Sequence, residues 1–241
     1  ARSSNFKAFR EIFVTLAIYA SLWVVAVSLV ENGSWLFVPV CVFAAVIFMR
    51  IFLLFHDCLH ANLFETKRAN QICAFLLGLL FFVPSRYWTE EHLAHHATSQ
   101  NLDRRGRGDV VMLTVEEYLA LSPFNRLAYR LLRTMPGLFL VEMIGRWQIL
   151  YRLPATGRSK EAAAGIIYTN IGLVVVQGSI ILLAGWQNYL IVFGLIYLVG
   201  GCLGVWLFVS QHDFEESVWE RNADWSLKKS PWAGSSFLDL P

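Results

Sequence analysis

Six histidines are the residues of this sequence whose type and spacing best suit metal chemistry. All of them lie in three short stretches, H-D-C-L-H, H-L-A-H-H and Q-H-D-F-E, as His56, His60, His92, His95, His96 and His212. Residues three or four positions apart share a face of a helix, so each of the first two stretches would point its imidazoles in one direction. Neutral imidazole is a common ligand of iron and zinc. The six histidines are therefore predicted to hold metal.

A structural role is the alternative for each histidine taken alone, because one histidine on a helix usually packs or forms a hydrogen bond. Five histidines in two boxes, with a sixth at the end of another apolar segment, are hard to explain in that way. Six imidazoles exceed the four ligands of a tetrahedral zinc ion, whereas histidine-rich ligation with open positions suits iron that activates oxygen. The ligand count favours two metal ions.

Two aspartates beside these histidines are weaker candidates. Asp57 and Asp213 could each hydrogen-bond a ligating imidazole, as carboxylates near metal sites often do; the alternative for each is an ordinary solvated or helix-capping aspartate. The four cysteines contain no C-x-x-C pair, and most lie in apolar stretches. We therefore expect neither a disulfide framework nor a zinc finger.

The segments that position the histidines are apolar enough for a membrane. Of the 241 residues, 56% are hydrophobic and 16% charged, against about 25% charged in an ordinary soluble domain. Runs long enough to cross a hydrocarbon core as helices lie at 12–30, 35–55, 164–184 and 189–210. They predict an all-α multi-pass integral membrane protein, with about four transmembrane helices in two hairpins.

Two further segments are expected to be helical without crossing the membrane. Residues 72–84 are apolar but too few for a span, which favours a re-entrant or interfacial helix. Residues 136–153 mix apolar and charged side chains, which fits either an amphipathic helix on the membrane surface or a packed helix of a cytoplasmic cap. Nucleic-acid binding has no support, because the basic residues are not clustered.

The distribution of cations predicts the topology. None of the 20 Lys and Arg residues lies in the hairpin turns at 31–34 and 185–188, and cytoplasmic loops are the ones that carry such cations. Both turns are expected outside. The three histidine stretches each follow the cytoplasmic end of an apolar segment, so they are expected at one depth on the cytoplasmic face.

Around the histidines the sequence resembles the membrane fatty acid desaturase family, whose histidine boxes have the forms H-x-x-x-H and H-x-x-H-H. The similarity is greatest to bacterial and plastid-type acyl-lipid desaturases of the omega-6 or delta-12 type. It covers nearly the whole chain, which predicts a single desaturase-like domain over residues 1–241. The stretches that carry it beyond the boxes are 95–99, 101–106, 108–110, 113–115, 211–215, 234–236 and 239–241.

The resemblance implies a non-haem di-iron enzyme of lipid metabolism in a bilayer, the bacterial inner membrane. Such an enzyme uses O₂ and two electrons to remove two hydrogens from an unactivated fatty acyl chain. Ferredoxin or a cytochrome b5-like carrier would supply the electrons. His212 resembles an extra ligand of several relatives, and the residues that match the family's iron ligands are His56, His60, His92, His95 and His96.

Two departures from the family pattern bear on these expectations. Leu59 stands beside the second histidine of the first box, where glycine is common. A third box, H-x-x-H-H, is absent before Pro241. We therefore expect the domain to be incomplete at its C-terminal end, and this chain alone not to turn over.

Other functions are compatible with parts of the pattern. A fatty acyl or alkane hydroxylase would share the metal site, and an inactive truncated fragment would share the sequence. A zinc-dependent intramembrane hydrolase is disfavoured because no H-E-x-x-H motif occurs. A metal transporter is disfavoured because transporter sites lie near the membrane midplane, whereas these histidines follow the ends of apolar runs.

Overall fold

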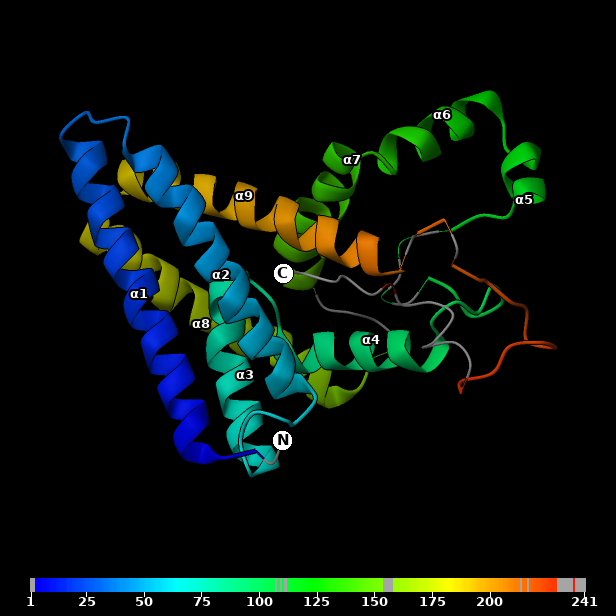
Figure 1. Ribbon diagram of the computed structural model, residues 1–241, viewed down its shortest axis with the longest axis horizontal. Coiled ribbons are helices and arrows are strands. Elements are labelled where there is room, and N and C mark those ends of the chain that lie inside the picture. The colour runs from blue at the N-terminus through cyan, green and yellow to red at the C-terminus, as the bar shows by residue number, and fades with distance from the viewer. Residues whose placement is uncertain are drawn as a thin grey trace. The chain divides into compact units, whose positions relative to one another are not determined.

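Four long apolar helices form the frame of the protein. A computed structural model describes residues 3–106, 108, 110, 112–153, 158–212, 214–215, 217–228 and 236, and the regular elements among them are all helical. The helices long and apolar enough to cross a membrane are α1 (Asn5–Glu31), α2 (Phe37–Leu59), α8 (Lys160–Ala184) and α9 (Trp186–His212) (Figure 1). The prediction of an all-α multi-pass membrane protein is confirmed.

Each long helix extends beyond the apolar run from which it was predicted. Helix α1 begins at Asn5, seven residues before the predicted run, and therefore includes the charged residues Lys7 and Arg10. The turn between α8 and α9 lies where it was predicted. Gly185 has a positive φ of 80° there, a conformation that glycine adopts without steric cost.

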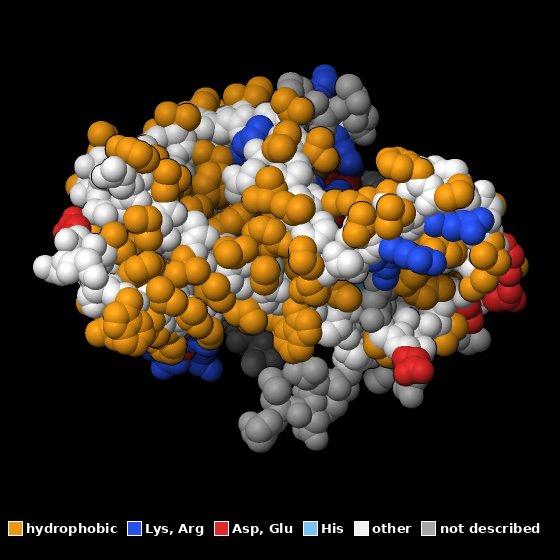
Figure 2. All heavy atoms as spheres, turned by 90° about the horizontal axis from the view of Figure 1, so that it is seen from above, with side chains coloured by type: hydrophobic (Ala, Val, Ile, Leu, Met, Phe, Trp, Pro, Cys, Tyr) orange, Lys and Arg blue, Asp and Glu red, His pale blue; other side chains and the backbone are white. Residues whose placement is uncertain are grey.

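The outer surfaces of these helices are apolar and uncovered. In the most apolar stretch of each, between 17% and 33% of the residues are buried within the protein. Leu182 and Leu183 on α8 and Phe13 on α1 are among the exposed side chains. Figure 2 shows hydrophobic side chains spread over one face of the molecule. A surface of this kind is stable against lipid tails and unstable against water.

The chain divides into two compact units. The first contains Ala1–Tyr87 and Gly145–Leu203, and the second contains Trp88–Ile144 and Gly204–Pro241. The divisions fall within helices, at α4 (Ser85–Thr98), at the π-helix η1 (Leu140–Ile149) and at α9.

The first unit is held together by aromatic packing between α1, α2, α3 (Lys67–Phe81) and α9. The ring of Phe48 on α2 is buried, with its centroid 4.4 Å from Phe81 and 5.8 Å from Tyr19. Arg50, inside the apolar run of α2, donates to Glu11 at 2.6 Å. This pairing compensates a cation that would be costly against lipid.

Helix α3 ends at a sharp bend, and side chains from later segments bind its last carbonyl groups. Phe82 has a left-handed φ of 62°, and the chain turns sharply before α4. The Gln177 amide donates to the Leu79 carbonyl at 3.0 Å, and Arg152 donates to the Phe82 carbonyl. Unpaired carbonyls at a helix end are costly where water is excluded. Segment 72–84, predicted as re-entrant or interfacial, thus forms part of a broken span or a re-entrant pair.

The second unit contains shorter helices. These are α5 (Val115–Ala120), α6 (Pro123–Leu132) and α7 (Met135–Phe139), which is followed by η1. Thr114 and Glu117 form a capping box at the start of α5, and Ser122 caps α6 with proline at its first position. The segment 136–153, predicted as amphipathic, consists of parts of α7, the π-helix η1 and the 3₁₀ turn η2 (Leu150–Arg152) in place of one regular helix.

Candidate metal centre

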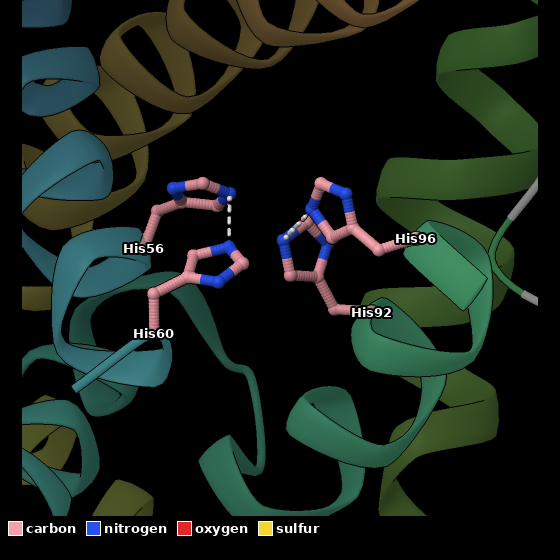
Figure 3. Close-up of side chains that lie close together, drawn as sticks. All are labelled: His56, His60, His92 and His96. Carbon is pink, nitrogen blue, oxygen red and sulfur yellow. Dashed lines mark hydrogen bonds between the residues drawn. The ribbon is translucent and has the colours of Figure 1, made fainter. Parts of the chain in front are cut away.

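The first histidine pair lies at the end of α2. His56 is in the last turn of the helix and His60 is its C-cap residue. Their Nε2 atoms are 3.3 Å apart (Figure 3). The i, i+4 spacing brings the rings together, and buried Phe55 and Cys58 on other sides of α2 fix the orientation of this turn. Asp57 is exposed beside His56, and its role toward an imidazole stays a prediction.

The second histidine box lies on α4, and its three histidines take part in two different pairs. The Nε2 atoms of His92 and His96 are 3.0 Å apart (Figure 3). His95 is buried and pairs with His212 at the end of α9, with Nε2 atoms 3.4 Å apart. The sequence indicated one shared face for the three box histidines, and the structure assigns the buried one to a partner 117 residues away. Asp213 lies outside the described residues.

The nitrogen spacing in all three pairs is that of an imidazole–imidazole hydrogen bond, and it is also compatible with two ligands on one metal ion. Two imidazole nitrogens bonded to one ion at about 2.0–2.1 Å stand roughly 3.0 Å apart at a right angle and roughly 3.4 Å apart at a tetrahedral angle. The observed distances, 3.0, 3.3 and 3.4 Å, cover the same range. Each pair could therefore bind an ion with little movement of its helix.

Among the described residues, the group that could hold a metal ion consists only of histidines. The first unit contributes the pair His56 and His60, and the second unit contributes the pair His92 and His96; each is a candidate ligand pair by itself. Imidazole-only ligation suits iron, zinc or copper better than magnesium or calcium, which prefer oxygen ligands. The donor set thus fits a transition metal.

Two aromatic side chains that the sequence analysis did not single out pack against these histidines. The Trp88 ring is stacked on His92, with centroids 4.5 Å apart and an interplanar angle of 9°. Phe208 lies 5.6 Å from His95 and 5.2 Å from His212 between ring centroids. Both are four residues before a histidine on the same helix, a spacing visible in the sequence. They restrict the orientations of the imidazoles.

Gly108 brings the loop after the second box against α4. It has a positive φ of 73°, and a Cβ atom there would lie 2.9 Å from the Glu91 carbonyl oxygen and 2.9 Å from the Cβ of His95. A side chain at this position would displace the buried histidine. The approach of this loop therefore depends on glycine.

The segments that follow α4 and α9 are tied together. Asn101 and Glu220 form an isolated parallel bridge, and the Arg221 guanidinium donates to Asp103 at 2.7 Å. The Asn222 backbone N–H also donates to Asp103, and these two hydrogen bonds hold the pKa of the carboxyl below its ordinary value of 3.8. We call residues 99–103 and 220–225 the clamp. It connects the ends of the two helices that carry His95 and His212.

Comparison with known proteins adds the family. A family model described as fatty acid desaturase matches residues 33–238, a range that contains all six histidines. The chain belongs to the fatty acid desaturase family. The resemblance predicted from the histidine boxes is thus confirmed.

Three relatives show how far the similarity extends. A fatty acid desaturase of Bacillus subtilis is 40% identical over 92% of this chain and 63% of its own length. An sn-1 acyl-lipid omega-3 desaturase (ferredoxin) of Nostoc is 26% identical over 94% of this chain and 62% of its own length. An endoplasmic-reticulum omega-3 fatty acid desaturase of Nicotiana tabacum is 31% identical over 31% of this chain and 20% of its own length.

The chain therefore spans just under two thirds of the length of the first two relatives. Where the names of relatives give a double-bond position, it is omega-3, so the omega-6 or delta-12 type suggested by the sequence stays a prediction.

Proposed function

We propose that this chain contains the metal site of an O₂-dependent fatty acyl desaturase, in which histidines hold two iron ions. The proposed ligands are His56, His60, His92, His95, His96 and His212. The observation that carries the proposal is the pairing of all six imidazoles at 3.0–3.4 Å between Nε2 atoms, in a chain of the desaturase family. A hydrogen bond between two imidazoles has the same spacing, and the gathering of all six histidines into such pairs in a chain of this family is what favours metal binding.

Bound iron would supply the activation of O₂ and the removal of hydrogen from an unactivated C–H bond. The residues of this chain hold, orient and shield the site. Trp88 and Phe208 fix the planes of three imidazoles and exclude water from one side of each ring. About two turns before the end of α2, the partly exposed rings of Phe52 and Trp147 stack on each other, and Phe52 also packs against buried Phe81, which makes an apolar environment that suits an acyl chain.

The proposed reaction needs an external reductant. Conversion of –CH₂–CH₂– to –CH=CH– releases two hydrogen atoms, which carry two electrons and two protons. Reduction of one O₂ to two waters consumes four electrons and four protons. Two more electrons and two protons must therefore come from a donor, for which we propose ferredoxin or a cytochrome b5-like protein. The printed name of the Nostoc relative includes ferredoxin.

We place the metal site on the cytoplasmic face of a bacterial inner membrane. The support is the absence of Lys and Arg from both turns between the long helices, 31–34 and 185–188, because cations are concentrated in cytoplasmic loops. On this side the site can meet a soluble electron donor.

The proposal is tested by metal content and product in cells that express the full-length protein. His56→Ala and His95→Ala should each lower iron per chain and abolish the new unsaturated acyl lipid. Leu93→Ala alters an exposed residue of α4 that lies between His92 and His95 in the sequence. This variant is the matched control, and it should change neither the iron content nor the lipid product. Zinc in place of iron would favour a hydrolase, and a hydroxylated acyl product would favour a hydroxylase; either result contradicts the proposal.

A further inference from the structure

Helices α5 and α6 carry an apolar ridge that no other described element covers. Helix α6 separates its apolar and polar faces strongly. Phe124 is 77% exposed, Leu127 55% and Leu131 57%. Their i, i+3, i+7 spacing places them on one face of the helix. Val115 and Leu119 are likewise exposed on α5.

Arg126 and Arg130 lie on another face of α6, and Arg133 is its C-cap residue. Because a helix turns by about 100° per residue, these three positions are centred about a third of a turn from the ridge. Arg126 donates to the Leu119 and Leu121 carbonyls at 2.6 and 3.0 Å. Arg130 donates to the Tyr118 hydroxyl at 2.6 Å. These hydrogen bonds keep the arginines away from the ridge.

Between α5 and α6 lies an open cleft that combines cations with aromatic and apolar walls. Its volume is about 520 Å³, and Tyr118, Tyr129, Arg130 and Arg133 line it together with Leu113 and Val115. The Arg133 guanidinium lies 5.7 Å from the centroid of the Tyr129 ring. Where α5 and α6 lie in Figure 2, Lys or Arg, Asp or Glu, and hydrophobic side chains share the surface. An anionic headgroup with an acyl chain has complementary chemistry.

We propose that α5 and α6 lie on the bilayer surface as an anionic-lipid binding element, with the ridge in the acyl layer and the arginines beside lipid phosphates. The dimensions agree, because a helix with its side chains is about 10–12 Å across and interfacial helices sink by about 5–10 Å. The far face then remains among the headgroups, where arginine pairs with phosphate in bidentate fashion. The chain also contains helices long and apolar enough to cross a membrane, so a bilayer is part of its surroundings. This inference does not depend on the metal site.

The test measures the depth of α6 in the full chain. A nitroxide is attached at Leu127→Cys on the ridge or at the matched control Asn125→Cys on the polar flank, after Cys73 and Cys202 are changed to alanine. The chain is reconstituted in nanodiscs of phosphatidylcholine alone or mixed with phosphatidylglycerol. The Leu127 label should collide with dissolved O₂, and the Asn125 label with a water-soluble nickel chelate. Phosphatidylglycerol should increase the lipid-inserted fraction of the Leu127 label.

The contribution of the arginines is separated with charge variants. Arg130→Gln and Arg133→Gln should each lower the ratio of inserted to water-exposed label in anionic discs roughly fivefold, the effect expected of one cation near an anionic leaflet. Arg104→Gln, an exposed arginine outside α5 and α6, should leave the ratio unchanged. Equal nickel access to both labels in both discs would overturn the proposal. The proposal would also be overturned if the Leu127 label became protected from the nickel chelate only when an acidic protein such as ferredoxin was added. Protection that developed only as the chain concentration rose would overturn it too.

Discussion

A single methyl group added at Gly108 tests whether the position of His95 depends on the close approach of this loop to α4. Gly108→Ala adds left-handed strain, which costs about 1–3 kcal/mol, and places a Cβ 2.9 Å from the Cβ of His95. Gly106 provides a matched control, because it has a φ of 99° with no atom within 4 Å of the added Cβ. Both variants should lower the unfolding temperature, and only Gly108→Ala should also lower iron per chain. Equal iron in the two variants would show that His95 does not depend on this contact.

Trp88 is expected to position His92. Trp88→Leu removes the stacked ring and should weaken metal retention roughly tenfold, a loss typical of residues that orient a ligand. Trp88→Phe keeps a planar ring and should retain most of the metal-binding strength. The measurements are the rate of metal loss to a chelator and the optical spectrum of the metal-loaded protein. If Phe and Leu behave alike, the ring plane is not what matters.

At the scale of elements, the clamp should open in acid. The pKa of Asp103 is lowered by hydrogen bonds from Asn222 and Arg221. A carboxyl with a lowered folded pKa stabilises the fold above its unfolded pKa, and this contribution is lost as pH falls through the folded pKa. The protection of the amides at 99–103 and 220–225, which is the intrinsic exchange rate at each pH divided by the observed rate, should therefore be high at neutral pH and should fall below the ordinary pKa of aspartate.

Two variants isolate the carboxylate. Asp103→Asn should accelerate exchange in the clamp at neutral pH and remove its acid dependence. Asp224→Asn, at an exposed aspartate within the same clamp segment, is the control and should keep the wild-type profile. An unchanged acid dependence in Asp103→Asn would assign the opening to another group.

The end of α3 depends on one amide from α8. Gln177 donates to the Leu79 carbonyl and accepts from the Tyr189 hydroxyl at 2.8 Å. Gln177→Leu leaves both groups buried without this partner and should lower the free energy of unfolding by about 1–3 kcal/mol for each. Thermal unfolding in detergent measures the loss. Ser179→Ala, whose hydroxyl donates only within α8 at an exposed position, should have a small effect, and equal losses would refute the role of Gln177.

At the scale of the whole molecule, the topology can be tested by labelling. A membrane-impermeant thiol reagent should reach Asn32→Cys, in the exposed turn between α1 and α2, from outside intact cells. It should reach Lys67→Cys, exposed at the start of α3, only after the membrane is opened. The reverse pattern would move the histidines to the outer face and remove the case for a cytoplasmic electron donor.

The long helices could be predicted from the sequence because lipid exposure requires uninterrupted apolar runs. Apart from the start of α1, the ends of these runs lie within about four residues of the observed helix ends. The pairing of His95 with His212 could not be predicted from the sequence, because it depends on where the last turn of α9 lies relative to α4. The amphipathic helix α6 was missed because its ten residues lie in a polar region. The π-helix η1 was missed because its backbone pattern has no simple periodicity in the sequence.

The hydrogen bonds at the end of α3 can form only late in the synthesis of the chain. The Leu79 carbonyl accepts from a side chain 98 residues later, and the Phe82 carbonyl from one 70 residues later. At about 5–20 residues per second, roughly 5–20 s pass between the emergence of the bend and that of its final partner. During this interval the nascent segment has exposed backbone groups that lipid cannot satisfy. We expect the ribosome or the insertion machinery to keep this segment away from lipid until α8 has been synthesised. A mutation in α8 can therefore impair the membrane insertion of α3, a segment that is made much earlier.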